Sequence, residues 1–258
     1  MTKRVEFDFS GKVVAITGGS RGLGHAMALA FAAGGANLAI ASRKLDSCEA
    51  TVKEIRALGR DGSAHAIHVG KWADCDRMVE EVYGRWGRCD VLINNAGLSP
   101  LYPSLVEHTE DLFDKVIGVN LKGPFRLSAL FGSRMAKGDG GAIINVASIA
   151  AIRPSATTAP YSAAKAGLNA LTVAFSNEYG PKVRVNCIMA GPFHTDISIG
   201  WSRTPEFTKR ARENYAMGRA GEPDEIVGAA LYLASPWASF TTGAVLKVDG
   251  GQSDPRVA

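Results

Sequence analysis

Residues 12–24 read K-V-V-A-I-T-G-G-S-R-G-L-G. The first six form a short apolar run rich in β-branched residues, which is typical of a strand buried on both faces. A helical pattern follows at 25–34, H-A-M-A-L-A-F-A-A-G, and Gly34 and Gly35 mark its end. A glycine-rich turn therefore joins a buried strand to a helix, which is how a parallel α/β fold begins.

This glycine turn predicts a dinucleotide site. Gly18, Gly22 and Gly24 allow the backbone to approach a phosphate, and the N-terminus of the helix offers free N–H groups and a positive dipole. The spacing departs from G-x-G-x-x-G because three residues separate the first two glycines, and a plain tight turn is the alternative. The strand before and the helix after favour the cofactor. The contacts expected here are Gly18, Ser20, Arg21, Gly22, Leu23 and Gly24.

The end of the next strand bears on the choice of cofactor. N-L-A-I-A at 37–41 leads into Ser42, Arg43 and Lys44, at a place where an acidic residue would hold the ribose hydroxyls of NAD. Ser42 can instead hydrogen-bond a 2′-phosphate, and Arg43 can pair with it or lie against the adenine. Arg21 can reach the same group from the glycine turn. We therefore expect NADP(H), with NAD(H) the less favoured cofactor.

Length and composition limit the other possibilities. The chain has 258 residues, 46% of them hydrophobic, and 29 glycines, which fits one globular domain. Its formal charge of +4 is spread without a block of like charges, so a nucleic-acid partner is not indicated. The four cysteines have neither C-x-x-C spacing nor histidines at zinc spacing, so no metal is expected.

Two further observations concern location. The N-terminus M-T-K-R-V-E-F-D-F-S lacks the apolar core of a signal peptide. No run approaches the ~20 apolar residues that a membrane span needs. We expect a cytoplasmic protein with no membrane partner.

Apolar runs and helical patterns alternate along the whole chain. Strands are expected near 12–17, 36–42, 64–69, 89–94, 141–147, 182–188 and 244–248. Such alternation predicts a single Rossmann-type domain, a doubly wound parallel sheet of about seven strands flanked by helices, with ligands at the carboxyl ends of the strands. The glycine turn, Asn95, Ser148 and the segment after Ile188 all lie at such ends.

The stretch from Ser148 to Lys165 holds candidate acid–base groups. Tyr161 and Lys165 are four residues apart in an alanine-rich run, so both project from one face of a helix. A nearby ammonium lowers the pKa of a phenol, which would let Tyr161 give a proton to a carbonyl oxygen. A solvated helix face is the ordinary alternative for such a pair.

Together these residues resemble the short-chain dehydrogenase/reductase family over nearly the whole chain. Six features stand in the family's order: T-G-G-S-R-G-L-G at 17–24, N-N-A-G at 94–97, Asn120, Ser148, Y-S-A-A-K at 161–165 and V-D-G-G at 248–251. The C-terminal half is similar to 3-oxoacyl-carrier-protein reductases and to sugar or polyol dehydrogenases.

The resemblance implies roles for four catalytic residues. Tyr161 would be the acid in reduction and the base in oxidation, while Lys165 would lower its pKa and hold the nicotinamide ribose. Ser148 would hydrogen-bond the substrate oxygen. Asn120 would hold a water that links Lys165 to solvent.

The resemblance also implies the remaining cofactor contacts. Asn95, Ala96 and Gly97 would pass beneath the adenosine ribose, with Asn94 bracing the neighbouring strand. Thr195 would contact the nicotinamide carboxamide with the backbone of Phe193. His68, next to Val69, stands where many members have an aspartate that reads the adenine. Ala190-Gly191-Pro192 departs from the family's usual proline-then-glycine order. The conformation of the protein backbone that would surround the nicotinamide near Gly191 is therefore in question.

The substrate pocket is expected between Leu98–Pro103, Ile149–Pro154 and Phe193–Tyr215, with a mobile amphipathic lid at about 192–220. The expected activity is hydride transfer between nicotinamide and a ketone, an aldehyde or a secondary alcohol of 3-oxoacyl or sugar/polyol type. A non-catalytic NADP-binding sensor is the alternative. Family members pair through helices that correspond to about 108–136 and 161–179, so a homotetramer or homodimer is implied.

Overall fold

The computed structural model describes residues 7–252 and contains a seven-stranded sheet in the order β3-β2-β1-β4-β5-β6-β7. All neighbouring strands pair in parallel. The strands are β1 (Val13–Thr17), β2 (Asn37–Ser42), β3 (Gly62–Ala66), β4 (Val91–Asn94), β5 (Gly141–Ser148), β6 (Val183–Ala190) and β7 (Val245–Val248). The predicted doubly wound parallel sheet is therefore confirmed.

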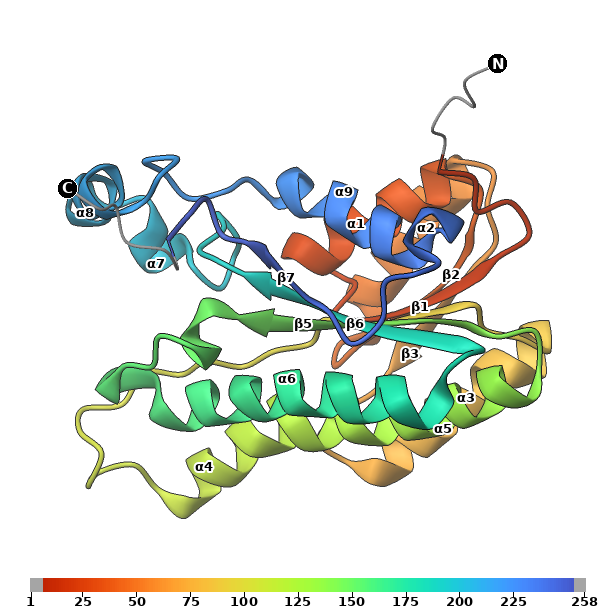
Figure 1. The fold of residues 1–258 in the computed structure, drawn as a ribbon, viewed down its shortest axis with the longest axis horizontal. Helices are drawn as coiled ribbons and strands as arrows, with labels where there is room; N and C mark the ends of the chain where they lie inside the picture. The colour runs from red at the N-terminus through yellow and green to blue at the C-terminus, as the bar shows by residue number, and fades with distance from the viewer. Residues whose placement is uncertain (1–6, 253–258) are drawn as a thin grey trace.

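Helices cover both faces of this sheet. They are α1 (Gly22–Ala33), α2 (Leu45–Ala57), α3 (Trp72–Trp86), α4 (Glu110–Ile117), α5 (Gly123–Lys137), α6 (Ala159–Tyr179), α7 (Ile199–Ser202), α8 (Pro205–Asn214) and α9 (Val227–Ala234). Figure 1 shows α1, α2 and α9 above the sheet and α3 to α6 below it, with α7 and α8 beyond the ends of β5 and β6.

Two apolar cores follow from this layering, one on each face. The upper core joins alternate residues of β1 and β2, such as Val14 and Ile40, to Phe31 of α1. In the lower core, Val13 and other residues of the opposite parity pack against Phe131 of α5. The continuous apolar strands predicted from the sequence are thus required, because each strand is covered from both sides.

Two predicted elements differ from the structure. The third strand spans Gly62–Ala66 and not 64–69, because the chain turns at His68, whose carbonyl accepts a hydrogen bond from Lys71 N. The long helix expected at 108–136 starts at Glu110 and is interrupted by a π-helical turn, η1 (Gly118–Lys122). Single π turns of this kind are common at functional sites, and Asn120 lies at the centre of this one.

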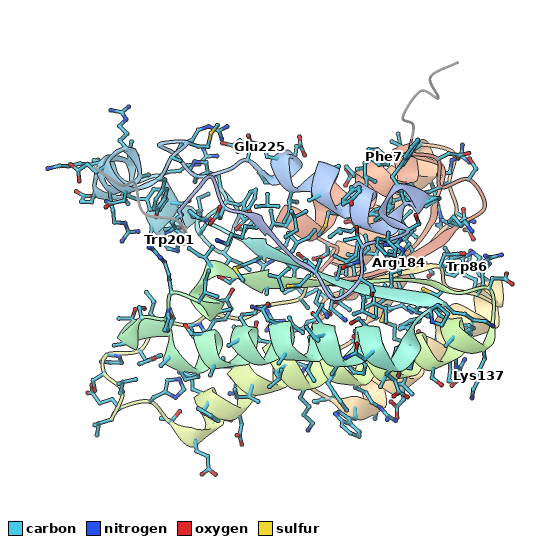
Figure 2. All side chains as sticks on the ribbon, in the orientation of Figure 1. Phe7, Trp86, Lys137, Arg184, Trp201 and Glu225 are labelled. Atoms are coloured by element: carbon cyan, nitrogen blue, oxygen red, sulfur yellow. The ribbon has the colours of Figure 1, made fainter. Side chains whose placement is uncertain are left out.

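The segment predicted as a lid forms α7, α8 and a small core of its own. Phe207, Ala211, Tyr215 and Ala220 are buried together, and the Trp201 ring packs against Phe207 with 5.2 Å between centroids. Figure 2 shows Trp201 at the end of the molecule where β5 and β6 finish. The mobility of this segment stays a prediction.

Within the described residues no helix is both long enough and apolar enough to cross a membrane. Residues 1–6, on which the expected lack of a signal core partly depends, lie outside the described part of the chain.

Candidate active site

The glycine turn is packed too tightly for side chains. Gly18 and Gly22 have φ of 65° and 55°, in the left-handed region that favours glycine. A Cβ at Gly24 would lie 2.2 Å from the carbonyl oxygen of Gly18. No acidic residue occupies the first turn of α1, so its positive end is not neutralised locally. These features fit a bound diphosphate.

The residues that follow β4 are hydrogen-bonded to this turn and to the strand before it. The Asn95 side chain donates to the carbonyl oxygens of Thr17 and Gly18 at 3.1 and 3.2 Å. The backbone N–H groups of Asn95 and Ala96 donate to the Thr17 hydroxyl. Asn95 and Ala96 therefore lie beside the glycine turn, as the sequence predicts, and Thr17 is a positioning residue that sequence reasoning missed.

A buried polar row supports the same strand ends. Asn94 donates to the Ser128 hydroxyl and to Oδ1 of Asn145, both at 2.9 Å. Asn145 in turn donates to the Thr172 hydroxyl at 2.9 Å. Because buried amides are costly unless they are hydrogen-bonded, this row links β4 and β5 to α5 and α6 in one arrangement.

Asn120 is fully buried and joins the π turn to the chain after β4. Its Nδ2 donates to the carbonyl oxygens of Leu98 and Val116 at 2.7 and 2.9 Å, and its Oδ1 accepts from Leu98 N at 3.2 Å. Both amide protons are thus used within the protein, and Oδ1 keeps the free lone pair. A Cβ at Gly97 would lie 3.4 Å from Oδ1 and 4.0 Å from Lys165 Nζ, which places Asn120, Gly97 and Lys165 together. The water relay stays a prediction.

Ser148, at the end of β5, meets Tyr161 on α6. The Ser148 hydroxyl accepts from Ala150 N at 3.2 Å, so its own proton can be donated to the Tyr161 oxygen. A hydrogen bond from Ser148 lowers the pKa of Tyr161, but burial has the larger effect and raises it. The tyrosine therefore stays protonated at neutral pH and is suited to give a proton.

Lys165 lies one turn further along α6 and is 3% exposed. Its Nζ is 5.7 Å from the centre of the Tyr161 ring and donates to the carbonyl oxygen of Val146 at 2.7 Å. Burial lowers the pKa of Lys165 to about 8. The predicted lowering of the Tyr161 pKa by Lys165 stays a prediction, because burial and Ser148 account for the shift in this structure.

The opposite end of the site contains the residues predicted to select the cofactor. Ser20 donates to the Ser42 hydroxyl at 3.0 Å, so the glycine turn and the end of β2 meet there. Arg21 and Arg43 are exposed. Within residues 7–252 neither guanidinium has a hydrogen bond or an ion pair, so both are free to bind an anion. Leu23 is half-buried in the first turn of α1 and packs against the upper core.

His68 and Val69 contact their own turn. His68 Nδ1 accepts from Gly70 N at 3.2 Å, and its backbone N–H donates to Asp74. Val69 is buried in the lower core. The contact of His68 with adenine stays a prediction.

The Ala190-Gly191-Pro192 departure leaves an ordered backbone. A Cβ at Gly191 would lie 2.6 Å from Asp249 Cα, so glycine is required there. The carbonyl oxygen of Pro192 accepts from Gly221 N at 3.0 Å, and Phe193 forms a β-bridge with Gly221.

Thr195 follows on this backbone and reaches the glycine turn. Its N–H donates to the Ser198 hydroxyl at 2.9 Å. A Cβ built at Gly22 would lie 3.4 Å from its side chain. Gly191, Phe193 and Thr195 thus connect the end of β6 to the glycine turn, and their contact with the nicotinamide stays a prediction.

Tyr102 is a second residue that sequence reasoning missed. It is buried in the loop after β4, donates to the carbonyl oxygen of Ala156 at 2.6 Å and accepts from Ala159 N at 2.8 Å. The N-cap residue of α6, Thr158, makes no side-chain cap. Tyr102 therefore caps the helix that carries Tyr161 and Lys165 from 57 residues away, a distance at which no local pattern signals the contact.

A hollow of about 670 Å³ lies between α1, residues 194–203 and the start of α9. Gly22 and Thr195 line it, whereas Ser148, Tyr161 and Lys165 do not. The chemistry of the last three residues is the better guide to the site, because catalytic groups are recognised by mutual geometry.

Comparison with known proteins agrees with this arrangement. A family model described as enoyl-(acyl carrier protein) reductase matches residues 18–253. Dehydrogenase/reductase SDR family member 4 of Pongo abelii is 33% identical over 93% of this chain and 87% of its own length. A 2-dehydro-3-deoxy-D-gluconate 5-dehydrogenase of Pseudoalteromonas atlantica is 36% identical over 95% and 97%. A 3-oxoacyl-(acyl-carrier-protein) reductase of Thermotoga maritima is 34% identical over 93% and 97%.

Solved structures give the same result. A 7α-hydroxysteroid dehydrogenase complexed with NADH and 7-oxo glycochenodeoxycholic acid superposes with a TM-score of 0.91 and 30% identity over 97% of this chain and 98% of that one. A structure described as an NAD(P)-dependent gluconate 5-dehydrogenase of Beutenbergia cavernae, with bound NADP at low occupancy, has a TM-score of 0.90 and 30% identity over 96% and 99%. This chain belongs to the short-chain dehydrogenase/reductase family and is an oxidoreductase of that family.

Proposed function

We propose that this protein is an NADP(H)-dependent oxidoreductase that transfers hydride between the nicotinamide and a ketone, an aldehyde or a secondary alcohol. The observation that carries the proposal is the meeting of Ser148, Tyr161 and a buried Lys165 beside Gly97 and Asn120. A lysine that is 3% exposed is costly to bury. The position of Lys165 next to the protonated phenol of Tyr161 gives a functional reason for burying this lysine.

The residues of the chain divide the work as follows. When bound, the nicotinamide supplies or accepts the hydride. Ser148 donates its proton to the substrate oxygen when substrate is bound and polarises the carbonyl. Tyr161 gives its proton to that oxygen during reduction and takes it back during oxidation. Lys165, as an ammonium, holds ribose hydroxyls and stabilises the phenolate that Tyr161 becomes.

The cofactor preference rests on the other end of the site. Ser42 stands at the end of β2, where the next residue is Arg43 and no carboxylate follows directly. Arg21 follows Ser20, which donates to Ser42, and neither arginine has an ion pair within residues 7–252. This charge pattern favours the 2′-phosphate of NADP over the ribose diol of NAD. The related structures include one with NADH and one with NADP, so the residues of this chain carry the argument.

The substrate is proposed to be partly apolar. Each of the three predicted pocket walls exposes a large apolar side chain: Leu101 at 75%, Ile152 at 47% and Ile199 at 62%. Arg153, a cation in the Ile149–Pro154 wall that could anchor an anionic substrate, donates to the carbonyl oxygen of Gln252 at 3.1 Å. These features favour a 3-oxoacyl chain or another apolar ketone over a polyol. The homotetramer or homodimer and the cytoplasmic location stay predictions.

The decisive experiment compares the wild type with Tyr161→Phe. NADPH oxidation is followed with a panel that includes a 3-oxoacyl thioester, a bulky cyclic ketone and a keto-sugar acid, and NADPH binding is followed by nicotinamide fluorescence. We expect turnover to fall by about 10²- to 10⁴-fold with NADPH affinity unchanged. Tyr179→Phe, on the same helix, is the control. Tight NADPH binding without turnover of any substrate in the wild type would support the sensor instead.

A further inference from the structure

We propose that Cys48 is a positioning residue for cofactor choice, whose thiol turns the Ser42 hydroxyl proton toward the 2′-phosphate of the adenosine ribose. The inference rests on the proposed NADP(H) function. It adds a buried residue, outside the residues expected to touch the cofactor, that determines how well one of them does so.

Cys48 is fully buried in the first turn of α2, directly beneath the end of β2. Its Sγ lies 3.1 Å from the Ser42 hydroxyl oxygen and 3.8 Å from the carbonyl oxygen of His65. Ser42 is the nearer partner, and the 3.8 Å contact is long even for sulfur. Cys48 and Ser42 therefore form the inner link of a chain that continues to Ser20.

The direction of the protons along this chain follows from the other contact of Ser42. The Ser42 hydroxyl donates its one proton to the carbonyl oxygen of Lys44 at 3.4 Å, so in the 3.1 Å contact with Cys48 the thiol is the donor. Ser42 then accepts from Cys48 on the inside and from Ser20 at 3.0 Å. With both lone pairs occupied, the Ser42 proton must point elsewhere.

The acceptor that Ser42 has in this structure is a weak one. Its hydroxyl donates to the carbonyl oxygen of Lys44 at 3.4 Å, near the outer limit for such a bond. A phosphate oxygen is a stronger, charged acceptor. A 2′-phosphate can thus take over this proton at little cost, and Ser42 meets it as a donor.

Without the thiol proton, the direction in which the Ser42 hydroxyl donates its hydrogen bond is no longer fixed. Ser42 could then donate to the Ser20 hydroxyl and present lone pairs to the phosphate, which weakens NADPH binding and leaves NADH binding nearly unchanged. An aliphatic residue at position 48 would pack equally well against Val52 and Ile55 of the upper core. Packing alone therefore does not account for a thiol at hydrogen-bond distance from Ser42.

The test uses a pair of variants that differ in one donor. Cys48→Ser replaces the sulfur with a smaller oxygen and keeps a donor, whereas Cys48→Ala removes the donor and leaves a small space in its place. The readout is the ratio of the NADH to the NADPH dissociation constant, measured by nicotinamide fluorescence. We expect Cys48→Ala to lower this ratio by about threefold to tenfold, as loss of one hydrogen bond does, and Cys48→Ser to restore it. In a Ser42→Ala background, Cys48→Ala should have no further effect.

Either of two results for these variants would overturn the inference. Equal ratios for the alanine and serine variants, or an equal loss of affinity for both cofactors, would mean that Cys48 only packs. If Cys48→Ala does not fold by circular dichroism, Cys48→Val replaces it, since valine fills the space without a donor and should lower the ratio in the same way. The wild type alone tests the proposed function: tighter binding of NADH would refute the NADP(H) proposal and the role of Cys48 with it, before any variant is made.

Discussion

The two ends of the site are built in opposite ways. At the catalytic end, defined by Asn120, Ser148, Tyr161 and Lys165, the polar groups are buried or half-buried and already hydrogen-bonded within the protein. The other end is the one proposed to bind the adenosine ribose, and we call it the ribose end; it is defined by Ser20, Arg21, Ser42 and Arg43. There the two serine hydroxyls are hydrogen-bonded to each other, and both arginines are exposed to solvent. In the proposed function the chemistry is therefore assigned to groups held in the core, whereas the choice of cofactor is assigned to surface cations beside a hydrogen-bonded hydroxyl.

This difference has a physical basis. Proton transfer needs groups whose pKa and position are set before the substrate arrives, and burial provides both. An arginine that pairs with phosphate can be ordered by the ligand itself, at the cost of its side-chain entropy. We therefore expect substitutions at the catalytic end to change the rate and substitutions at the ribose end to change affinity.

After Tyr161→Phe, Ser148→Ala should give the largest effect. Loss of the donor to the substrate oxygen is expected to reduce kcat by about 100-fold while NADPH affinity stays the same, because the hydroxyl lies at the catalytic end. Steady-state kinetics and fluorescence titration measure the two quantities. Ser155→Ala, which removes an exposed hydroxyl in the next turn, is the control. An equal fall in affinity would erase the distinction between the two ends.

Arg43→Gln should act in the opposite sense. It removes a free cation from the ribose end, so NADPH affinity should fall by about tenfold or more, with NADH affinity and kcat at saturating NADPH little changed. Arg60→Gln, which removes an exposed arginine elsewhere, controls for net charge. A large drop in kcat with unchanged affinity would contradict the assignment of Arg43.

The pH dependence should report the catalytic end alone. Burial lowers the pKa of Lys165 to about 8 from its ordinary value of 10.5, so Lys165 is charged below that pH and neutral above it. The rate of carbonyl reduction should therefore fall above about pH 8, by about tenfold for each pH unit. Arginines do not titrate in this range. In Lys165→Arg the decline should move to higher pH, and a profile unchanged by that substitution would assign the transition to another group.

Tyr102→Phe should have the smallest effect on the rate. It leaves the Ala159 N–H at the start of α6 without an acceptor, which should lower the free energy of unfolding by about 1–3 kcal/mol and reduce kcat severalfold as Tyr161 becomes less well held. Denaturant unfolding and kinetics measure both. Tyr83→Phe is a matched control, because the buried Tyr83 hydroxyl has no hydrogen-bond partner within the described residues. Equal stability of the two variants would show that the cap is unimportant.

Much of the fold was predictable because its signals are local. The apolar strand at 13–17, the glycine turn and the helix after it are consecutive in the chain, and all seven predicted strands are present. The errors lie where the signal is not local. The interruption of the predicted 108–136 helix is marked only by Gly118, Gly123 and Pro124, which signal a break but not a π turn. The π turn also depends on Asn120, which bonds to Leu98 as well as to its own helix.

The chain's local patterns determined the parallel sheet, the dinucleotide turn and the residues that carry the resemblance to the family. They also placed Ser42 and Arg43 at a strand end, since strand ends can be found from periodicity. Only the tertiary structure decided that Thr17 supports Asn95, that Tyr102 caps α6 and that Cys48 lies beneath Ser42. These contacts join residues from separate segments, and their partners become neighbours only when the sheet and its helices close around the core.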